Sequence, residues 1–361
     1  MMNVMDTLAA NAAQTEQRGR VVETSLKAAK AAGAFALRTP VAHGGSWATA
    51  TVAVELIAAM ARGCPSTAWI ASTSLVSKNM ISFGDYPAHT LDEVFADPDA
   101  VAGGVGIPRG HGESGLNGVR LSGRWANVSG CEDAVWASLG AMVDGAFAIV
   151  LIPMADLTID RTWDVAGMSG TGSHSLVADD VLVPFDRVAT GERLHYPPDG
   201  RTVQTWGVAV LATAVGATLG ALDVVDTMFA SNRKPFATSY TRMSESPGAR
   251  HWLAEATTLV RRAERTMLAL ASRIDAEPGI TDLEHAGMQR DRADAAKDCL
   301  AAIERMLDLH GASGFAKSNA LQRFWRDVSV VSRHPALNPY LAVEGFGRAL
   351  TESSPLPRPR A

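Results

Sequence analysis

The chain has 361 residues, of which 47% are hydrophobic and 20% are charged, and its formal net charge is -5. This composition is that of an ordinary soluble globular protein, and the length allows two or three packed subdomains. Lysine and arginine are scattered, so we expect no nucleic-acid partner, which would require clustered phosphate contacts. Cys64, Cys131 and Cys299 lie far apart without metal-ligand spacing, which predicts a cytoplasmic protein without a metal site.

Residues 1–100 are predicted to form an N-terminal helical domain. Charged residues interrupt the apolar stretch before Gly33, a pattern that does not fit a signal peptide. Val52, Leu56 and Met60 follow helical spacing. The chain breaks at Gly63 to Pro65, and the hydroxyl residues that follow are candidate caps of the next helix.

The pattern changes to β structure between about residues 101 and 188, and we predict a β domain over 101–200. Three short runs, 119–128, 146–152 and 176–183, are rich in β-forming residues and separated by turn residues. Apolar and polar side chains alternate in the first run, as in a half-buried antiparallel strand. Seven glycines fall between Gly103 and Gly118, and we attribute most of them to turns or bulges.

Residues 201–352 are predicted to form a four-helix bundle. The stretch from Trp206 to Leu222 is rich in alanine, glycine and threonine, which indicates a buried bundle helix rather than a membrane span. Two apolar stripes at helical spacing follow, over 253–274 and 288–309, and Gly311 is the expected stop of the second. The fourth helix is predicted through 337–350. The proline-rich tail, 353–361, is predicted to be loose.

Several motifs resemble one known family. Residues 163–174 read Trp-Asp-Val-Ala-Gly-Met-Ser-Gly-Thr-Gly-Ser-His, residues 125–130 read Trp-Ala-Asn-Val-Ser-Gly, and residues 40–45 read Pro-Val-Ala-His-Gly-Gly. Together with the strand-like 179–184 they resemble segments of the acyl-CoA dehydrogenase superfamily. The late segment Arg326-Asp327, followed by His334-Pro335-Ala336-Leu337, is similar to the signature of that family's flavin-dependent monooxygenase branch.

The resemblance implies a mainly α fold with a middle antiparallel β-barrel between the two helical domains. It also implies the oxygenase component of a two-component monooxygenase that uses reduced FMN or FAD and O2, through a C4a-hydroperoxyflavin. A separate NAD(P)H flavin reductase would be its transient partner, and a homotetramer, without a membrane, its assembly. The early motifs look most like the branch that oxidises aromatic polyketides, which makes a natural-product intermediate the expected small-molecule substrate.

The resemblance also implies the site residues. His334 and Ser173 would be catalytic, with Ser173 donating to flavin N5. His334 would donate over C4a or accept a substrate proton, as an imidazole with a pKa near neutral can. The expected flavin-binding residues are Trp125, Ser129, Trp163, Thr171, Ser173, Arg233 and Asn338. The two tryptophans would supply apolar area, the hydroxyls would face the ring, and Arg233 would meet the phosphate.

Other interpretations compete with this one. Glu344, in Val-Glu-Gly-Phe, partly imitates the catalytic segment of the dehydrogenase branch, which keeps an acyl-CoA dehydrogenase-type oxidoreductase open. Amino-sugar N-oxygenation and a flavin-free helical scaffold are further alternatives. Ser173 in a glycine-rich loop is also consistent with a simple turn, and His334 before Pro335 with a helix cap.

Overall fold

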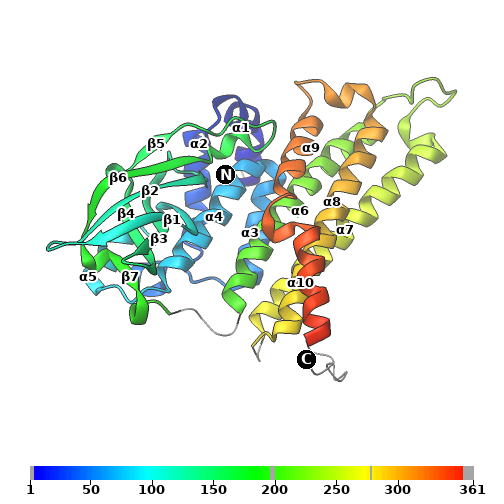
Figure 1. Cartoon of the computed structure of the whole chain (residues 1–361). Coiled ribbons are helices and arrows are strands. Elements are labelled where there is room, and N and C mark those ends of the chain that lie inside the picture. The colour runs from blue at the N-terminus through cyan, green and yellow to red at the C-terminus, as the bar shows by residue number, and fades with distance from the viewer. Residues whose placement is uncertain (1–3, 196–199, 277–278, 353–361) are drawn as a thin grey trace. The chain divides into compact units, whose positions relative to one another are not determined.

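The computed structural model describes residues 4–195, 200–276 and 279–352. The chain forms two compact units, Met1–Pro197 and Pro198–Ala361 (Figure 1). The three-domain division at residues 100 and 200 stays a prediction, and the predicted loose tail lies outside the described residues.

The first unit begins with helices that follow the predicted breaks. They are α1 (Val4–Arg18), α2 (Glu23–Ala31), α3 (Ala50–Gly63), α4 (Pro65–Ile81) and α5 (Ala88–Val94). The Thr49 side chain caps α3 by accepting from the backbone N–H of Val52, 3.3 Å away. Pro65 opens α4, where its missing N–H costs nothing. The N-terminal residues are therefore helical, as the periodicity predicts.

A seven-stranded sheet follows. Its strands are β1 (Val101–Ser114), β2 (Val119–Val128), β3 (Ala134–Val143), β4 (Ala146–Pro153), β5 (Thr158–Asp160), β6 (His174–Val183) and β7 (Val188–Thr190), in the order β5-β6-β2-β1-β3-β4-β7. The sheet curls, because β4 and β6 touch although three strands separate them in that order. Its inner face encloses one core, to which β2, β3, β4 and β6 all contribute.

The strand directions correct one detail of the prediction. Five of the six pairings in the described sheet are antiparallel, but β1 and β3 are parallel. β2 returns along β1 as a hairpin, and the chain then turns back to pair β3 with the other edge of β1. Because β2 and β3 run in opposite directions, β3 has to run the same way as β1.

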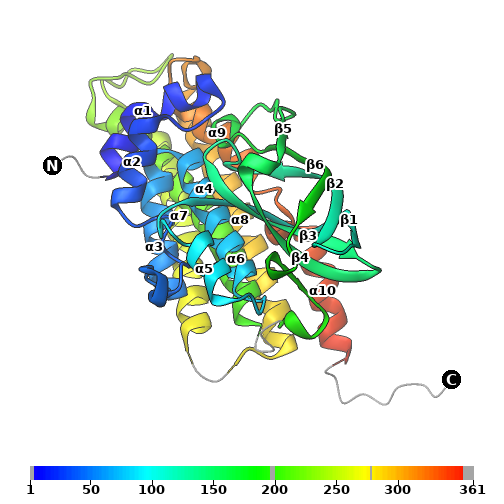
Figure 2. The same cartoon turned by 90° about the vertical axis from the view of Figure 1, so that its left-hand side faces the viewer.

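The structure also corrects the prediction that most of the glycines between Gly103 and Gly118 serve turns or bulges. Five of them lie inside the strand rather than in turns: Gly103, Gly104, Gly106, Gly110 and Gly112. A Cβ atom on Gly110 would overlap the Trp125 ring, and one on Gly104 would overlap the Ser77 hydroxyl of α4. They therefore allow an indole and a helix to approach the backbone closely, and α4 packs against β1 (Figure 2). A bulge is present as well, between Val105 and Gly110.

The second unit is helical. It contains α6 (Arg201–Ala230), α7 (Pro247–Asp275), α8 (Asp282–His310), α9 (Ala320–Val331) and α10 (Pro339–Glu352). The helix α6 packs against α7, α8 and α9, while α10 lies on α8. The two predicted stripes form the buried faces of α7 and α8. The predicted last helix is α10, and α9 is a bundle helix that the apolar pattern does not single out.

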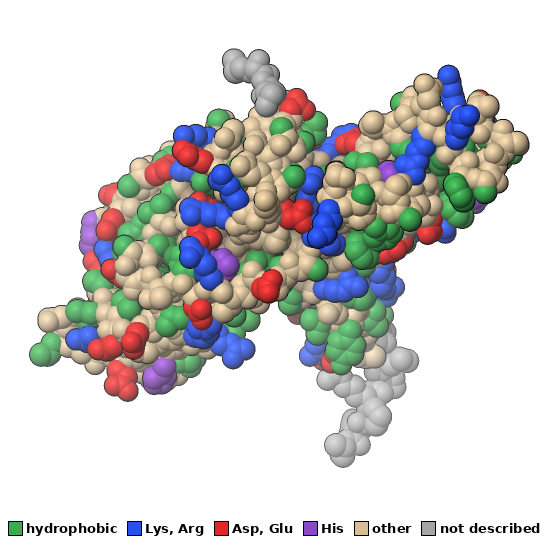
Figure 3. Space-filling model, turned by 90° about the horizontal axis from the view of Figure 1, so that it is seen from above, with side chains coloured by type: hydrophobic (Ala, Val, Ile, Leu, Met, Phe, Trp, Pro, Cys, Tyr) green, Lys and Arg blue, Asp and Glu red, His purple; other side chains and the backbone are tan. Residues whose placement is uncertain are grey.

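The helix α6 is the one described helix that is long and apolar enough to cross a membrane by length and composition. Of its most apolar window, 89% is buried inside the protein, as expected for a core helix. Acidic and basic side chains are interspersed over the face shown in Figure 3, in keeping with the scattered charges of the sequence.

Candidate active site

Three of the predicted site hydroxyls meet in the first unit. Ser129 follows β2, while Thr171 and Ser173 belong to the turn that leads into β6. The Ser129 Oγ lies 2.7 Å from the Ser173 Oγ, which lies 2.7 Å from the Thr171 Oγ1. All three side chains are buried, Ser173 with 3% of its surface exposed. The fold thus brings together residues that are 44 positions apart into one hydrogen-bonded row.

An indole stands at each end of this row. The Trp69 Nε1–H of α4 donates to the Ser129 Oγ over 2.9 Å. At the other end, the Met168 carbonyl oxygen accepts from the Thr171 hydroxyl at 2.8 Å and from the Trp163 Nε1–H at 3.0 Å. The row therefore spans α4, the end of β2 and the turn before β6, and it includes four of the predicted site residues.

The turn that carries Thr171 has an unusual backbone. Met168 and Gly172 both adopt the left-handed region, with φ of 56° and 50°. A non-glycine residue is seldom found there, and such strain gathers at functional sites. The backbone N–H of Gly130 donates to the Thr171 carbonyl oxygen over 2.8 Å, which fixes the turn to the end of β2.

Trp163 lines a cleft of about 790 Å³ beside this turn. Its backbone N–H donates to the Nδ1 of His174 at 3.1 Å, and the His174 Nε2 lies 3.7 Å from a carboxylate oxygen of Glu132. Ion pairs of Arg161 with Glu132 and of Arg20 with Asp133 contribute further polar groups to the wall of the cleft. His174 thus holds the loop, and Trp163 presents a half-buried ring to the cleft.

The structure corrects the role predicted for Trp125. The sequence places it among the flavin-binding residues, but its side chain is 0% exposed and lies in the core of the sheet. Its Nε1–H donates to the Gly140 carbonyl oxygen at 2.8 Å. A side chain with no accessible surface cannot contact a cofactor, so Trp125 supports the end of β2 from inside the core.

His334 lies in the second unit, between α9 and a short 3-10 turn at Pro335–Leu337. Its ring caps that following turn, because the Ala336 N–H donates to the His334 Nδ1. Burial lowers the pKa of His334 to about 4. The expectation of a near-neutral imidazole is therefore wrong. The ring is neutral at physiological pH, and with Nδ1 accepting, its proton lies on Nε2.

A buried arginine supports this turn. Arg292 of α8 is 2% exposed, and its guanidinium donates to the Gln204 Oε1 of α6 and, at 3.5 Å, to the Ala336 carbonyl oxygen. Burial lowers the pKa of Arg292 to about 10. A Cβ atom on Gly207 would overlap the guanidinium, so glycine is needed where this side chain crosses α6.

The two other predicted residues of this unit have structural partners. Arg233 donates to the His310 carbonyl oxygen at 2.5 Å and to the Ser313 hydroxyl at 2.9 Å, at the C-terminus of α8, where a cation is favourable. The Asn338 Oδ1 accepts from the Tyr340 N–H at 2.9 Å and caps α10. Their roles toward a cofactor stay predictions. Glu344, the residue of the dehydrogenase alternative, is exposed on α10.

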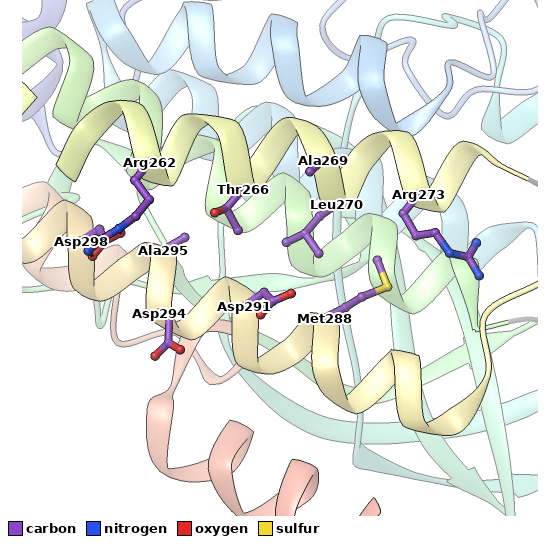
Figure 4. A pocket seen from close by; sticks show the side chains of 10 residues that line it. All are labelled: Arg262, Thr266, Ala269, Leu270, Arg273, Met288, Asp291, Asp294, Ala295 and Asp298. Atoms are coloured by element: carbon purple, nitrogen blue, oxygen red, sulfur yellow. Dashed lines mark hydrogen bonds and ion pairs between the residues drawn. The ribbon is translucent and has the colours of Figure 1, made fainter. Parts of the chain in front are cut away.

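A second cavity, of about 490 Å³, lies between α7 and α8 (Figure 4). An Arg262–Asp298 ion pair at 2.5 Å crosses one part of it, and Thr266, Leu270 and Asp291 line it. No predicted site residue is in this groove. Among the described residues, no group of three histidine, cysteine or acidic side chains has a metal-binding arrangement.

Comparison with known proteins shows to which family the chain belongs. The family model of the acyl-CoA dehydrogenase N-terminal domain matches residues 3–86, and that of the C-terminal domain matches residues 208–339. The oxygenase component of FADH(2)-dependent resorcinol hydroxylase from Rhizobium sp. (strain MTP-10005) is 30% identical, over 93% of this chain and 89% of that protein. The chain belongs to the acyl-CoA dehydrogenase superfamily.

Solved structures agree with this assignment to the acyl-CoA dehydrogenase superfamily. XiaF from Streptomyces sp., in complex with FADH2 and glycerol, has a TM-score of 0.88 and 27% identity over 98% of this chain and 94% of its own. The 3-HSA hydroxylase from Rhodococcus sp. RHA1 has a TM-score of 0.85 and 27% identity over 99% and 96%. The predicted family, its flavin-dependent monooxygenase branch and the predicted fold are confirmed.

The site suits the flavin of an acyl-CoA dehydrogenase superfamily member. A reduced isoalloxazine has broad apolar faces and carries an N–H donor at N5. The row of Ser129, Ser173 and Thr171 supplies buried hydroxyl oxygens, and Trp163 supplies a half-buried aromatic face. These groups match the ring in polarity.

Sequence reasoning missed Trp69 and Arg292 as members of these networks. Trp69 directly follows Pro-Ser-Thr-Ala, a segment whose pattern indicates only the start of a helix. Arg292 lies four residues after Met288 and three before Ala295, so it falls on the apolar stripe of α8. An arginine on a buried stripe is a signal that the sequence does contain.

Proposed function

We propose that this protein is the oxygenase component of a two-component monooxygenase, which uses reduced flavin and O2 to hydroxylate a phenolic small molecule. The observation that carries the proposal is the hydrogen-bonded row from Trp69 to Met168, whose three buried hydroxyls lie in the segments that resemble the family's flavin-side motifs. A bound reduced flavin supplies the activation of O2. The chain supplies a dry, polar wall and positioned hydrogen bonds.

The proposed roles follow from the local chemistry. Ser129, Thr171 and Ser173 hold the polar edge of the flavin, and Trp163 covers part of its apolar surface. His334, neutral and protonated on Nε2, acts as a hydrogen-bond donor to oxygen or to substrate rather than as a base. Asn338 lies four residues later, and Arg233 follows α6 and binds the C-terminus of α8. We propose both as further contacts to the flavin.

The substrate class is inferred from chemistry and from the relative. Resorcinol hydroxylase acts on a phenol by its name, and a phenol ring is electron-rich enough to accept an oxygen atom from an activated flavin. An aromatic natural-product intermediate is the finer proposal, supported by the resemblance of the early motifs. A flavin reductase that delivers the reduced cofactor is the proposed partner.

We also propose a homotetramer in the cytoplasm. Apolar side chains are exposed along α10, including Tyr340, Leu341 and Val343, and burying them in an assembly would be favourable. The three cysteines are buried free thiols, as in a reducing compartment.

The test measures how much product each reduced flavin yields. Purified protein is mixed with a flavin reductase, NADH, O2 and a panel of phenols, and hydroxylated product and H2O2 are quantified together. We expect product from at least one phenol, and a Ser173→Ala variant that releases more H2O2 per product. Reduced flavin that reoxidises as fast as in buffer, without product, contradicts the proposal. Bleaching of tightly bound FAD by an acyl thioester would indicate a dehydrogenase instead.

A further inference from the structure

The direction of each hydrogen bond in the row of hydroxyls can be deduced. The Met168 oxygen is a carbonyl and can only accept, so the Thr171 proton points to it. The contact between Thr171 and Ser173 then requires that Ser173 donates to Thr171. By the same argument, Ser129 donates to Ser173. Trp69, which can only donate, gives its indole proton to Ser129.

The row is therefore closed with respect to protons. Three hydroxyl groups carry three protons, and three internal bonds use them: Ser129 to Ser173, Ser173 to Thr171 and Thr171 to Met168. No hydroxyl proton is left for a ligand, whereas the oxygen lone pairs of the two serines remain available. The expected donation from Ser173 to flavin N5 is therefore replaced by acceptance, because the Ser173 proton is used by Thr171. A ligand that needs a donor from this wall has to break one internal bond, and a ligand that brings its own N–H does not.

We propose that this closed row makes the site select reduced over oxidised flavin, with Thr171 as the residue that determines the selectivity. This inference rests on the proposed function, which puts the flavin N5 edge against the serines. N5 of reduced flavin carries a hydrogen and donates, while N5 of oxidised flavin has a lone pair and accepts. A row of hydroxyls that offers only lone pairs satisfies the first and gives the second no hydroxyl donor.

Thr171 is decisive because of its position at the end of the row. Its hydroxyl takes up the Ser173 proton and passes its own proton to Met168. Replacing it with the isosteric valine removes one hydroxyl and two internal bonds. Ser129 and Ser173 then hold two protons for one internal bond, so one proton becomes free to donate to oxidised flavin.

The experiment measures dissociation constants of the full-length protein for oxidised flavin and, anaerobically, for reduced flavin. The readout is the ratio of the oxidised to the reduced constant. We expect Thr171→Val to lower this ratio by about fivefold or more, the equivalent of roughly one hydrogen bond. The control variant Thr171→Ser keeps the hydroxyl, so its ratio should equal that of the wild-type protein.

Trp69→Phe is the second control, because it removes a donor to Ser129 without freeing any proton. We expect its ratio not to fall. An unchanged ratio in Thr171→Val overturns the inference, and so does an equal fall in Thr171→Val and Trp69→Phe, which would indicate altered packing. Failure of the wild-type protein to bind reduced flavin at all would instead reject the proposed function.

Discussion

The backbone N–H of Ala336 donates to the Nδ1 of His334 across 3.2 Å. Protonation of the ring would break this bond, because a protonated Nδ1 has no lone pair to accept with. Burial acts in the same direction by disfavouring the charged ring. The imidazole that the sequence marks as catalytic is therefore held as a neutral donor by its own turn.

We predict that His334 makes the protein less stable in acid. Its pKa is about 4 in the folded protein against an ordinary value of 6.5, so between these values the unfolded chain binds the proton and the folded chain does not. The contribution of neutral His334 to the free energy of unfolding is complete above pH 6.5. It is lost as the pH falls from 6.5 through 4, and the loss amounts to about 3 kcal/mol. Urea unfolding of wild type and His334→Gln at several pH values measures it.

His334→Gln should flatten this loss between pH 6.5 and 4. The exposed His251 is a suitable control, and His251→Gln should keep the wild-type acid profile. Equal acid profiles for wild type and His334→Gln would show that the histidine does not resist protonation in the folded protein.

Arg292 should be needed for the stability of the second unit. Arg292→Gln shortens the side chain and leaves the Gln204 and Ala336 oxygens without their donor in a buried region. We expect a loss of about 2–3 kcal/mol in the free energy of unfolding. Arg290→Gln, whose arginine pairs with Asp294 at a partly exposed position, should cost under about 1 kcal/mol. Comparable losses in both variants would argue against a special role for the buried guanidinium.

Lys78 should act as an anchor between α4 and two loops. Its buried ammonium donates to the Phe35 and Pro98 carbonyl oxygens, at 2.6 and 2.8 Å, and to the Thr39 hydroxyl at 2.9 Å. Lys78→Met removes the ammonium donor from all three acceptors, although the Pro98 oxygen still accepts from the Thr39 hydroxyl at 2.7 Å. We expect a loss of about 3 kcal/mol in the free energy of unfolding. Lys30→Met removes only an exposed pair with Asp97 and should change the urea midpoint little. A wild-type midpoint for Lys78→Met would contradict this account.

Gly110 should tolerate no side chain. A methyl group there would overlap the Trp125 ring, whereas one on Gly115 in the adjacent hairpin meets its nearest neighbour at 3.6 Å, an ordinary contact. We expect Gly110→Ala to lower the free energy of unfolding by about 1–3 kcal/mol and Gly115→Ala to have a much smaller effect. Thermal unfolding of the two variants side by side measures the difference, and similar melting temperatures would refute it.

The sequence by itself determined the order of helices, sheet and bundle, because periodicity is a local property that each segment carries. The stripe from Leu253 to Ile274 became a face of α7, and the alternation at 119–128 became β2 with the same bounds. The motifs around Ser129 and Ser173 likewise marked the residues that meet. The glycines between Gly103 and Gly118 did not predict their own positions, because glycine occurs both in turns and where backbones pack closely. The structure places five of them inside β1.

Only the tertiary structure decided how those residues act. Trp69, Ser129 and Thr171 form one row because α4, β2 and the turn before β6 converge, and no local pattern encodes that convergence. Burial decided that Trp125 belongs to the core and that His334 stays neutral. Proton direction and pKa depend on which distant groups surround an atom and on how much water they exclude, and both are set only when the chain has folded.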